Sequence, residues 1–335
     1  MTEQIEASVQ AQNEIKKLVA VVVTFNRLDQ LQVTVARLLD CATGHLSGLV
    51  VVDNASTDGT AAWLAAQDDP RMDVVTMDVN GGGAGGFSAG MRHAMAQYDP
   101  DWLVLMDDDG RPAPGALAQF HALDGAKWDA IAAAVYFPSG DICEMNRPSR
   151  NPFWHGREFL KTALRGGGRD GFHLSREAYE SQDGRPIDVT SFVGFFVSCR
   201  MVRQVGFPDP GLFLYGDDGL YTLGISQRGG RIGFEPSVRF EHDCSTFGAA
   251  QRGRFSPLWK VYYYHRNLLL LYRMAAGWLF WPVLLLILPK WLWKARVHKG
   301  ERTVFLKLML RAIYDGLTGR LGASHHQVTA WAASD

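Results

Sequence analysis

Three consecutive acidic residues, Asp107, Asp108 and Asp109, follow directly on the apolar residues 103–106. An unbroken apolar run such as 103–106 is typical of a strand buried on both faces of a parallel sheet. The acids would then lie just beyond the carboxyl end of that strand, where open α/β sheets bind ligands. Adjacent carboxylates repel one another unless a cation lies between them, and their oxygens suit Mg²⁺ or Mn²⁺. We therefore expect a divalent metal site here; the alternative is a solvated acidic turn.

A second acidic pair, Asp217 and Asp218, follows another apolar stretch about a hundred residues later. We expect a helix over 219–227, whose positive N-terminal end would keep both carboxylates ionised. His242 ends a later predicted strand. The first cluster could bind a metal and the second could supply a general base. His242 could join the metal site, although a single histidine more often has a structural role.

Two further strand ends carry polar residues. Asp53 closes the predicted strand 49–52, where its carboxylate could accept hydrogen bonds from a nucleobase or ribose. An Asx-turn is the competing interpretation of Asp53. The glycine-rich residues 80–86, expected as a loop, would bring backbone N–H groups close to a ligand at the start of a helix over 87–97, which favours phosphate.

The glycine-rich segment also contains the pattern G-x-G-x-x-G at Gly81, Gly83 and Gly86. That dinucleotide fingerprint belongs after the first strand of a βαβ unit, whereas this segment follows the third predicted strand. The pattern is weak in so glycine-rich a stretch. We therefore disfavour a nicotinamide-dependent dehydrogenase.

Strands and helices alternate four times in the first 106 residues, which predicts a parallel, doubly wound α/β sheet. Residues 138–188 look irregular, and we assign them no role. The predicted strands cover 18–23, 49–52, 72–77, 103–106, 130–136, 192–199, 231–234 and 238–241, and the early helices cover 28–39, 60–66 and 87–97.

The bulk composition fits one large α/β domain with an appendage. The chain has 335 residues, of which 47% are hydrophobic and 21% charged, so a sizeable core is expected. The net charge of −1 gives no argument for a nucleic-acid partner. The four cysteines are widely spaced, which fits reduced cytosolic thiols better than a disulfide frame or a zinc site. Residues 1–17 form a leader without an apolar signal core, so export is not expected.

The C-terminal region, residues 251–335, has a different composition. Its longest uninterrupted apolar run, within 278–288, has about a dozen residues, fewer than the roughly 20 needed to span a bilayer. Aromatic residues and a basic flank favour helices that lie on an anionic membrane surface. The alternative is a buried helical hairpin packed on the catalytic domain, expected at 18–250, or on a partner subunit.

Three of these motifs together resemble family 2 glycosyltransferases of the GT-A fold. They are Val-Val-Thr-Phe-Asn-Arg at 22–27, Val-Asp-Asn-Ala-Ser-Thr-Asp-Gly-Thr at 52–60, and the acids at 107–109. The resemblance covers roughly 18–245. The glycine-rich segment and the triple acid look most like the galactofuranosyl- and rhamnosyltransferase branch. The resemblance implies a nucleotide-diphospho-sugar transferase fold with a mostly parallel central sheet, followed here by a C-terminal helical region.

The resemblance also implies roles for individual residues in an inverting transfer from a nucleotide diphosphate sugar. Asp107, Asp109 and His242 would bind Mn²⁺ or Mg²⁺, and Asp218 would be the general base. The substrate-binding residues would be Thr24, Asp53, Gly82, Gly83, Asp108 and Asp217.

Two positions depart from the family pattern, because Leu220 and Gly224 stand where an acid and an arginine are usual. They put acceptor recognition in doubt but leave the base and metal ligands in place. We expect UDP-galactofuranose as donor, dTDP-rhamnose as second choice, and a lipid-linked saccharide as acceptor. The enzyme would act in cell-wall or polysaccharide assembly at the cytoplasmic face of the cell membrane, and it could form a homo-oligomer.

Two other classes compete with this interpretation. A sugar nucleotidyltransferase would carry a glycine-rich, basic loop directly after the first strand, where this chain has 24–27, Thr-Phe-Asn-Arg. A catalytically inactive assembly subunit is the other alternative. The departures at Leu220 and Gly224 keep it open, whereas the intact acids and histidine speak against it.

Overall fold

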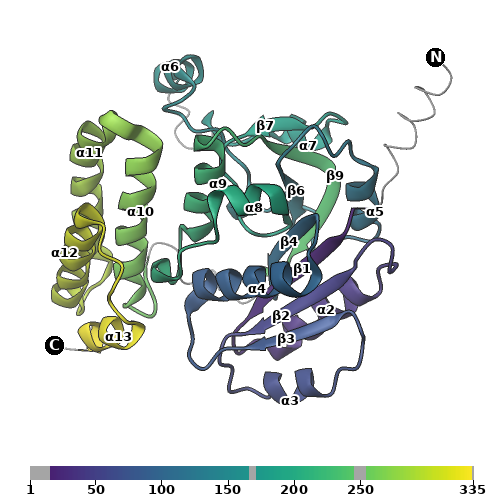
Figure 1. The fold of residues 1–335 in the computed structure, drawn as a ribbon. Coiled ribbons are helices and arrows are strands. Elements are labelled where there is room, and N and C mark those ends of the chain that lie inside the picture. The colour runs from purple at the N-terminus through teal and green to yellow at the C-terminus, as the bar shows by residue number, and fades with distance from the viewer. Residues whose placement is uncertain (1–15, 166–170, 245–253, 334–335) are drawn as a thin grey trace.

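The computed structural model describes residues 16–165, 171–244 and 254–333. The expected leader, 1–17, lies almost wholly outside these residues, as does the expected domain boundary near 250. Figure 1 shows an α/β part and, beside it, a group of four C-terminal helices.

The α/β part is built on one nine-stranded sheet in the order β3-β2-β1-β4-β8-β6-β9-β5, with β7 paired to β9. Six strands run in one direction, while β5, β7 and β8 run against them. The sheet is therefore mostly parallel, as expected. The strands are β1 (Leu18–Thr24), β2 (Gly48–Asp53), β3 (Met72–Thr76), β4 (Trp102–Asp107), β5 (Gly110–Pro112), β6 (Ala130–Tyr136), β7 (Arg185–Ile187), β8 (Phe195–Ser198) and β9 (Ile232–His242).

Helices cover both faces of the sheet. Apolar side chains of α4, α8 and α9 pack on one face, and those of α2, α3 and α5 pack on the other. Strands β1 and β2 are buried along their whole length because their valine-rich sequences suit a sheet covered on both sides. The helices of the α/β part are α2 (Leu28–Leu39), α3 (Thr60–Ala65), α4 (Gly82–Tyr98), α5 (Ala116–Ala122), α6 (Gly156–Arg165), α7 (Arg176–Glu180), α8 (Cys199–Val205) and α9 (Asp217–Gln227), with the short 3₁₀ turns η1 (Glu144–Asn146) and η3 (Pro210–Leu212).

Two sequence predictions about elements are wrong. The glycine-rich segment is mainly helix, because α4 begins at Gly82. A Cβ atom at Gly86 or Gly90 would lie 2.5 Å from a valine methyl group of β1, so these glycines let α4 pack closely on the sheet. The two strands expected between 231 and 241 form the single strand β9, whose pairing with β6 shifts register at Ala133/Ala134.

The C-terminal helices form a third apolar core. Helix α10 packs against α12 and also contacts α9, so this region is joined to the α/β part (Figure 1). The helices are α10 (Lys260–Ala276), α11 (Phe280–Trp293), α12 (Arg302–Thr318) and α13 (His325–Ala333), with the 3₁₀ turns η6 (Gly277–Leu279) and η7 (Lys294–Val297).

The helical stretch Lys260–Val297 is long and apolar enough, by length and composition alone, to be a candidate membrane span. The chain turns at Gly277, where φ is 55°, so α10 and α11 lie side by side as a hairpin (Figure 1). The 14 residues of α11 extend about 21 Å, less than the roughly 30 Å of a bilayer core. Much of α10 is buried, whereas α11 exposes apolar side chains. The structure thus combines features of both alternatives considered for this region.

Candidate active site

The parallel strands β1, β2 and β4 bring three predicted site residues to one edge of the sheet. Thr24 is paired with Asp53 across β1 and β2, and Val23 is paired with Asp107 across β1 and β4. Because parallel strands end at the same edge, Thr24, Asp53 and Asp107 lie next to one another there.

The triple acid is held by residues of β1 and of the loop that follows it. Thr24 Oγ1 donates a hydrogen bond to Asp108 Oδ2 at 2.8 Å. The guanidinium of Arg27 lies 3.1 Å from Asp108 Oδ1 and 2.7 Å from Asp109 Oδ2. Arg27 is a site residue that the sequence argument did not single out, although it closes the first motif. Its contact with the acids spans more than 80 residues, which no local pattern reveals.

His242 faces the same acids from the end of β9. Its Nε2 lies 3.2 Å from Asp109 Oδ1, while its Nδ1 lies 2.7 Å from Asn146 Oδ1. The Asn146 amide nitrogen donates to Ser191 Oγ at 2.8 Å, which turns the amide oxygen toward the histidine. With Nδ1–H donating to Asn146, Nε2 is the ring nitrogen directed at the acids. Asn146 is a second residue that sequence reasoning missed.

Two thiols lie beside His242, and Cys143 Sγ is 3.8 Å from its Nδ1. The ligand atoms of Cys143, His242 and Cys244 all lie within 4.8 Å of one another. The wide spacing of the cysteines gave no sign of this group. It is a soft-ligand cluster next to the acids. The four cysteines are free thiols, and the prediction that they serve no zinc site stays a prediction.

The pKa shifts of the triple acid and of His242 show why these residues suit a bound cation. Burial, together with the charges of Asp109 and Asp108, raises the pKa of Asp107 to about 7, and burial raises the pKa of Asp108 to about 7 as well. Burial acts on Asp109 in the same direction, but His242 and Arg27 lower its pKa below the usual range. Burial would lower the pKa of His242, yet Asp109 raises it to about 10.

Two buried carboxylate oxygens in this acidic cluster have ion-pair contacts without a well-aligned hydrogen bond from any described residue. Asp108 Oδ1 lies 3.1 Å from Arg27 Nη1, and Asp109 Oδ1 lies 3.2 Å from His242 Nε2. A buried group of carboxylates with a neighbouring imidazole has the donor set of a divalent metal site.

The second acidic pair begins α9, as expected. Burial, followed by the charges of Asp218 and Asp107, raises the pKa of Asp217 well above its usual value. The two acidic clusters are therefore close enough to influence each other. Burial also raises the pKa of Asp218, whose Oδ1 accepts a hydrogen bond from the Gly219 N–H at 2.6 Å.

The loop before α9 is fixed by α10. The Asn267 amide nitrogen donates to the carbonyl oxygens of Leu212 and Leu214 at 2.9 Å and of Tyr215 at 2.8 Å. The fully buried Arg266 donates from Nη2 to the Leu212 carbonyl at 2.9 Å. The C-terminal region thus holds the segment that positions the second acidic pair.

The glycine-rich segment supports phosphate binding less than expected. The Gly82 N–H already donates to Asn80 Oδ1 at 2.8 Å. A Cβ atom at Gly82 would lie 2.0 Å from the Phe213 carbonyl oxygen, so Gly82 is needed for the close approach of that loop. Gly83 is nearer to the acids, because a Cβ atom there would lie 3.7 Å from Asp217 Oδ2. Phosphate contacts at Gly82 and Gly83 stay predictions.

Asp53 forms the turn that was its competing interpretation. Its Oδ1 accepts a hydrogen bond from the Ser56 N–H at 2.9 Å, and the residue is buried. A contact between Asp53 and a nucleoside stays a prediction.

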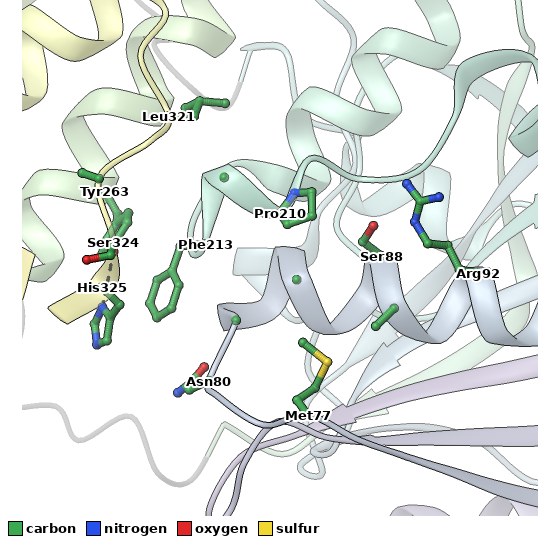
Figure 2. A pocket seen from close by; sticks show the side chains of 15 residues that line it. Met77, Asn80, Ser88, Arg92, Pro210, Phe213, Tyr263, Leu321, Ser324 and His325 are labelled. Atoms are coloured by element: carbon green, nitrogen blue, oxygen red, sulfur yellow. Dashed lines mark hydrogen bonds between the residues drawn. The ribbon is translucent and has the colours of Figure 1, made fainter. Parts of the chain in front are cut away.

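A hollow of about 400 Å³ lies on the outer side of α4. Figure 2 shows Phe213 between Asn80 on one side and Tyr263 and His325 on the other. The Phe213 ring stacks on His325 at 4.2 Å between centroids and on Tyr263 at 4.7 Å. This hollow therefore adjoins the loop that leads to the second acidic pair.

Comparison with known proteins identifies the family. The sequence profile described as Glycosyl transferase family 2 matches residues 19–180. The galactofuranosyltransferase GlfT1 of Mycolicibacterium smegmatis is 30% identical over 229 residues, which cover 68% of this chain and 71% of that protein. The chain belongs to glycosyltransferase family 2. It is related to the galactofuranosyltransferase branch, as its motifs predicted.

More distant relatives agree with this assignment. The undecaprenyl-phosphate mannosyltransferase of Micrococcus luteus is 28% identical over 151 residues, which cover 44% of this chain and 60% of that protein. The solved structure of the mannosyltransferase PcManGT from Pyrobaculum calidifontis, in complex with GDP-Man and Mn²⁺, matches with a TM-score of 0.52 and 17% identity. The match covers 95% of this chain and 79% of that one. At this identity the likeness shows the fold alone, and the fold is GT-A.

Proposed function

We propose that this family 2 glycosyltransferase moves galactofuranose from a nucleotide diphosphate donor to a hydroxyl group of a lipid-linked saccharide, with inversion and with Mn²⁺ or Mg²⁺ as cofactor. One observation carries the proposal: two buried acidic clusters and His242 converge at the carboxyl edge of the sheet. The similarity to GlfT1 supports galactofuranose as the sugar. A dTDP-rhamnose donor is the second candidate.

Asp107, Asp109 and His242 are the residues that would hold the cation. Asp109 Oδ1 and His242 Nε2, which lie 3.2 Å apart, supply the hard oxygen and the nitrogen that such ions accept. A bound divalent cation would act as a Lewis acid on the donor diphosphate and so stabilise the charge of the leaving group. Arg27 adds a fixed positive charge at the same cluster.

Asp218 would act as general base. Its carboxylate would accept the proton of the acceptor hydroxyl while that oxygen attacks the anomeric carbon. The bond between this carbon and the diphosphate oxygen breaks in the same displacement. Attack from the face opposite the leaving group inverts the configuration, so no covalent enzyme nucleophile is needed. The burial that raises the pKa of Asp218 makes it a stronger base than an exposed aspartate.

A lipid-linked acceptor is supported by two features. The Micrococcus luteus relative is named as an undecaprenyl-phosphate mannosyltransferase, and undecaprenyl phosphate is a polyprenyl lipid. Helix α11 exposes Trp281, Leu285 and Leu286 to solvent, each by at least 60%. Such a face, close to the basic residues Lys290 and Lys294, suits the surface of an anionic membrane. We infer a peripheral enzyme at the cytoplasmic face of the cell membrane, acting in cell-wall or polysaccharide synthesis.

The test is calorimetric titration of the full chain with a panel of donors, with Mn²⁺, with Mg²⁺ and without metal. The panel holds UDP-galactofuranose, UDP-galactopyranose, UDP-glucose and dTDP-rhamnose. We expect metal-dependent binding of UDP-galactofuranose. Asp109→Ala should weaken it by at least the roughly 10- to 100-fold that loss of a supporting metal contact costs. The exposed Asp68→Ala variant is the matched control and should bind like the parent.

The outcomes separate the parts of the proposal. Binding of dTDP-rhamnose alone would replace the donor but keep the reaction class. Binding that ignores metal and the Asp109→Ala change would overturn the assignment of the first acidic cluster. No binding of any donor by folded protein would sink the catalytic proposal.

A further inference from the structure

A groove of about 560 Å³ lies between α9 and α10, next to the segment 205–212. Its volume falls in the range of small-ligand sites, about 300–1,000 Å³. Leu220 and Tyr221 of α9 line one wall, and Leu270 and Met274 of α10 line the other. The groove thus has apolar sides along the length of α9.

The two ends of the groove carry different charges. Asp217 lies at one end, directly before the proposed base Asp218. Arg228 and Arg273 line the groove near the other ends of α9 and α10, and both are exposed. Neither arginine forms an ion pair with a carboxylate of the described residues. Arg273 Nη2 donates a hydrogen bond to the Leu317 carbonyl at 2.8 Å, and Arg228 Nη1 donates to the Gly224 carbonyl at 3.5 Å. Because a guanidinium has five N–H donors, each arginine keeps further donors for a ligand. The 11 residues of α9 separate Asp217 from Arg228 by about 16 Å.

Beyond Arg273 the surface becomes strongly apolar. The Arg273 guanidinium lies 5.2 Å from the centre of the Phe280 ring, at the turn between α10 and α11. Trp278 in this turn and Trp281 at the start of α11 are 83% and 60% exposed. An acid, a cationic pair and an apolar surface therefore follow one another from the catalytic site outward.

We propose that the acceptor lies along this groove, with its saccharide between α9 and α10, its phosphate at Arg228 and Arg273, and its lipid chain on the apolar turn that carries Trp278. This inference rests on the proposed function. The order of the three surfaces matches the order of the parts in a lipid phosphate-linked saccharide whose free end must reach Asp218. Guanidinium groups are well suited to phosphate because they donate paired hydrogen bonds.

The hollow on the outer side of α4 is a poorer candidate for the acceptor. Figure 2 shows that it lies between Phe213, Tyr263 and His325 on one side and Ser88 and Arg92 of α4 on the other. No acidic side chain is among its lining residues in the described part of the chain. Asp218 lines neither cavity, but the groove reaches its neighbour Asp217, whereas the hollow contains no residue of the second acidic pair.

Leu220 and Gly224 gain a role from this proposal. They are the two positions that depart from the family pattern, and both line the groove. A Cβ atom at Gly224 would meet only the Arg228 Nη1, at 3.6 Å, so the position has room for a side chain. An acid and an arginine would make the groove polar, whereas leucine and glycine leave it open and apolar. We infer that these residues select the acceptor saccharide.

The first experiment measures binding of farnesyl phosphate to the full chain by calorimetry, with farnesol and inorganic phosphate as reference ligands. We expect farnesyl phosphate to bind most tightly. Arg228→Gln and Arg273→Gln should each weaken it by about tenfold, the usual order for a hydrogen bond to a charged group. Arg176→Gln removes an exposed arginine outside the groove and should change nothing.

The proposal is overturned if both groove variants bind farnesyl phosphate like the parent, or if farnesol binds as tightly. An equal loss in Arg176→Gln would point to general attraction of anions. Binding of inorganic phosphate as tight as farnesyl phosphate would also contradict it, because the lipid chain would then contribute nothing. Donor titrations on the same samples report separately on the proposed function.

The second experiment measures transfer to disaccharides presented both as octyl glycosides and as farnesyl diphosphate esters. Gly224→Phe should raise the acceptor KM at least tenfold for both forms by filling the groove. Gly156→Phe, at an exposed glycine outside the groove with open space around it, is the matched control and should leave the KM unchanged. Arg228→Gln should raise the KM of the diphosphate form alone. Unchanged KM values in Gly224→Phe would refute the saccharide position. Absence of transfer by the parent would count against the proposed function instead.

Discussion

At the scale of single residues, the site depends on side chains that orient His242 and balance the charge of the acids. Asn146 is 5% exposed and binds His242 on the side away from the acids. Arg27 balances the charge of Asp108 and Asp109. Such supporting residues fix the direction and charge of the groups that would touch a metal or a substrate.

Asn146→Ala should weaken Mn²⁺ binding by about 10- to 100-fold, the usual cost of losing a residue that orients a metal-binding histidine. The reason is that Nδ1 of His242 loses its hydrogen-bond acceptor, so the ring no longer directs Nε2 at Asp109. Electron paramagnetic resonance of free Mn²⁺ measures this affinity. Asn146→Asp keeps an oxygen acceptor and should keep most of the affinity. Equal binding by the parent and Asn146→Ala would show that Asn146 does not orient the ring.

The rate of transfer should depend on the ionisation of Asp218. Burial raises the pKa of this carboxyl, and only the unprotonated form can accept the hydroxyl proton. The value of kcat should therefore fall about tenfold per unit as the pH drops below that raised pKa, and it should level off above it. A pH profile of kcat at saturating donor and acceptor measures this. Asp218→Asn should abolish transfer at every pH while donor binding persists, and residual activity with the same profile would rule out Asp218 as the base.

At the scale of elements, the C-terminal helix α10 holds the loop that leads to the second acidic pair. The loop before α9 contains Phe213 and Tyr215, which both have positive φ, at 64° and 67°. Residues other than glycine adopt this conformation at a cost of about 1–3 kcal/mol each, so the loop needs external support. Asn267 supplies it through three backbone carbonyls.

Asn267→Ala should destabilise the protein by about 3 kcal/mol, because the part-buried Leu214 and Tyr215 carbonyl groups lose the Asn267 donor, while the Leu212 carbonyl keeps Arg266. It should also lower kcat much more than donor affinity, since the loop leads to Asp218. Urea denaturation and steady-state kinetics measure the two effects. Thr329→Ala removes a hydroxyl that bonds only within α13 and should leave kcat unchanged. Parent-like kcat in a destabilised Asn267→Ala variant would limit Asn267 to folding.

The elements differ in how well the sequence predicted them. Strands β1, β2 and β4 were predicted to within about two residues, because unbroken apolar runs that end in polar residues are typical of buried parallel strands. The start of α4 was not predicted, because glycine is a poor helix former and this helix depends on close packing against β1. The acids of the site follow from local motifs. Arg27, Asn146 and Asn267 act on residues more than 50 positions away, which one sequence cannot show.

At the scale of the whole molecule, the exposed apolar face of α11 would bind the enzyme to a membrane surface. The double variant Trp281→Ser and Leu285→Ser removes two exposed apolar side chains from this face. Each buried side chain of this size contributes roughly 1.5–3 kcal/mol on leaving water, so binding to anionic vesicles should weaken at least tenfold. Vesicle sedimentation measures this. Val33→Ser changes an exposed apolar residue of α2 and should not affect it. Parent-like binding by the double variant would place the membrane contact elsewhere.

For the whole molecule we propose inverting, metal-dependent transfer, and one measurement tests that proposal most directly. Proton NMR of a reaction with UDP-galactofuranose and the lipid-linked acceptor reports the anomeric configuration of the product. We predict a configuration opposite to that of the donor, formed with Mn²⁺ or Mg²⁺ and lost on chelation. A product with the donor's configuration, or one formed equally well in the presence of chelator, would contradict the account.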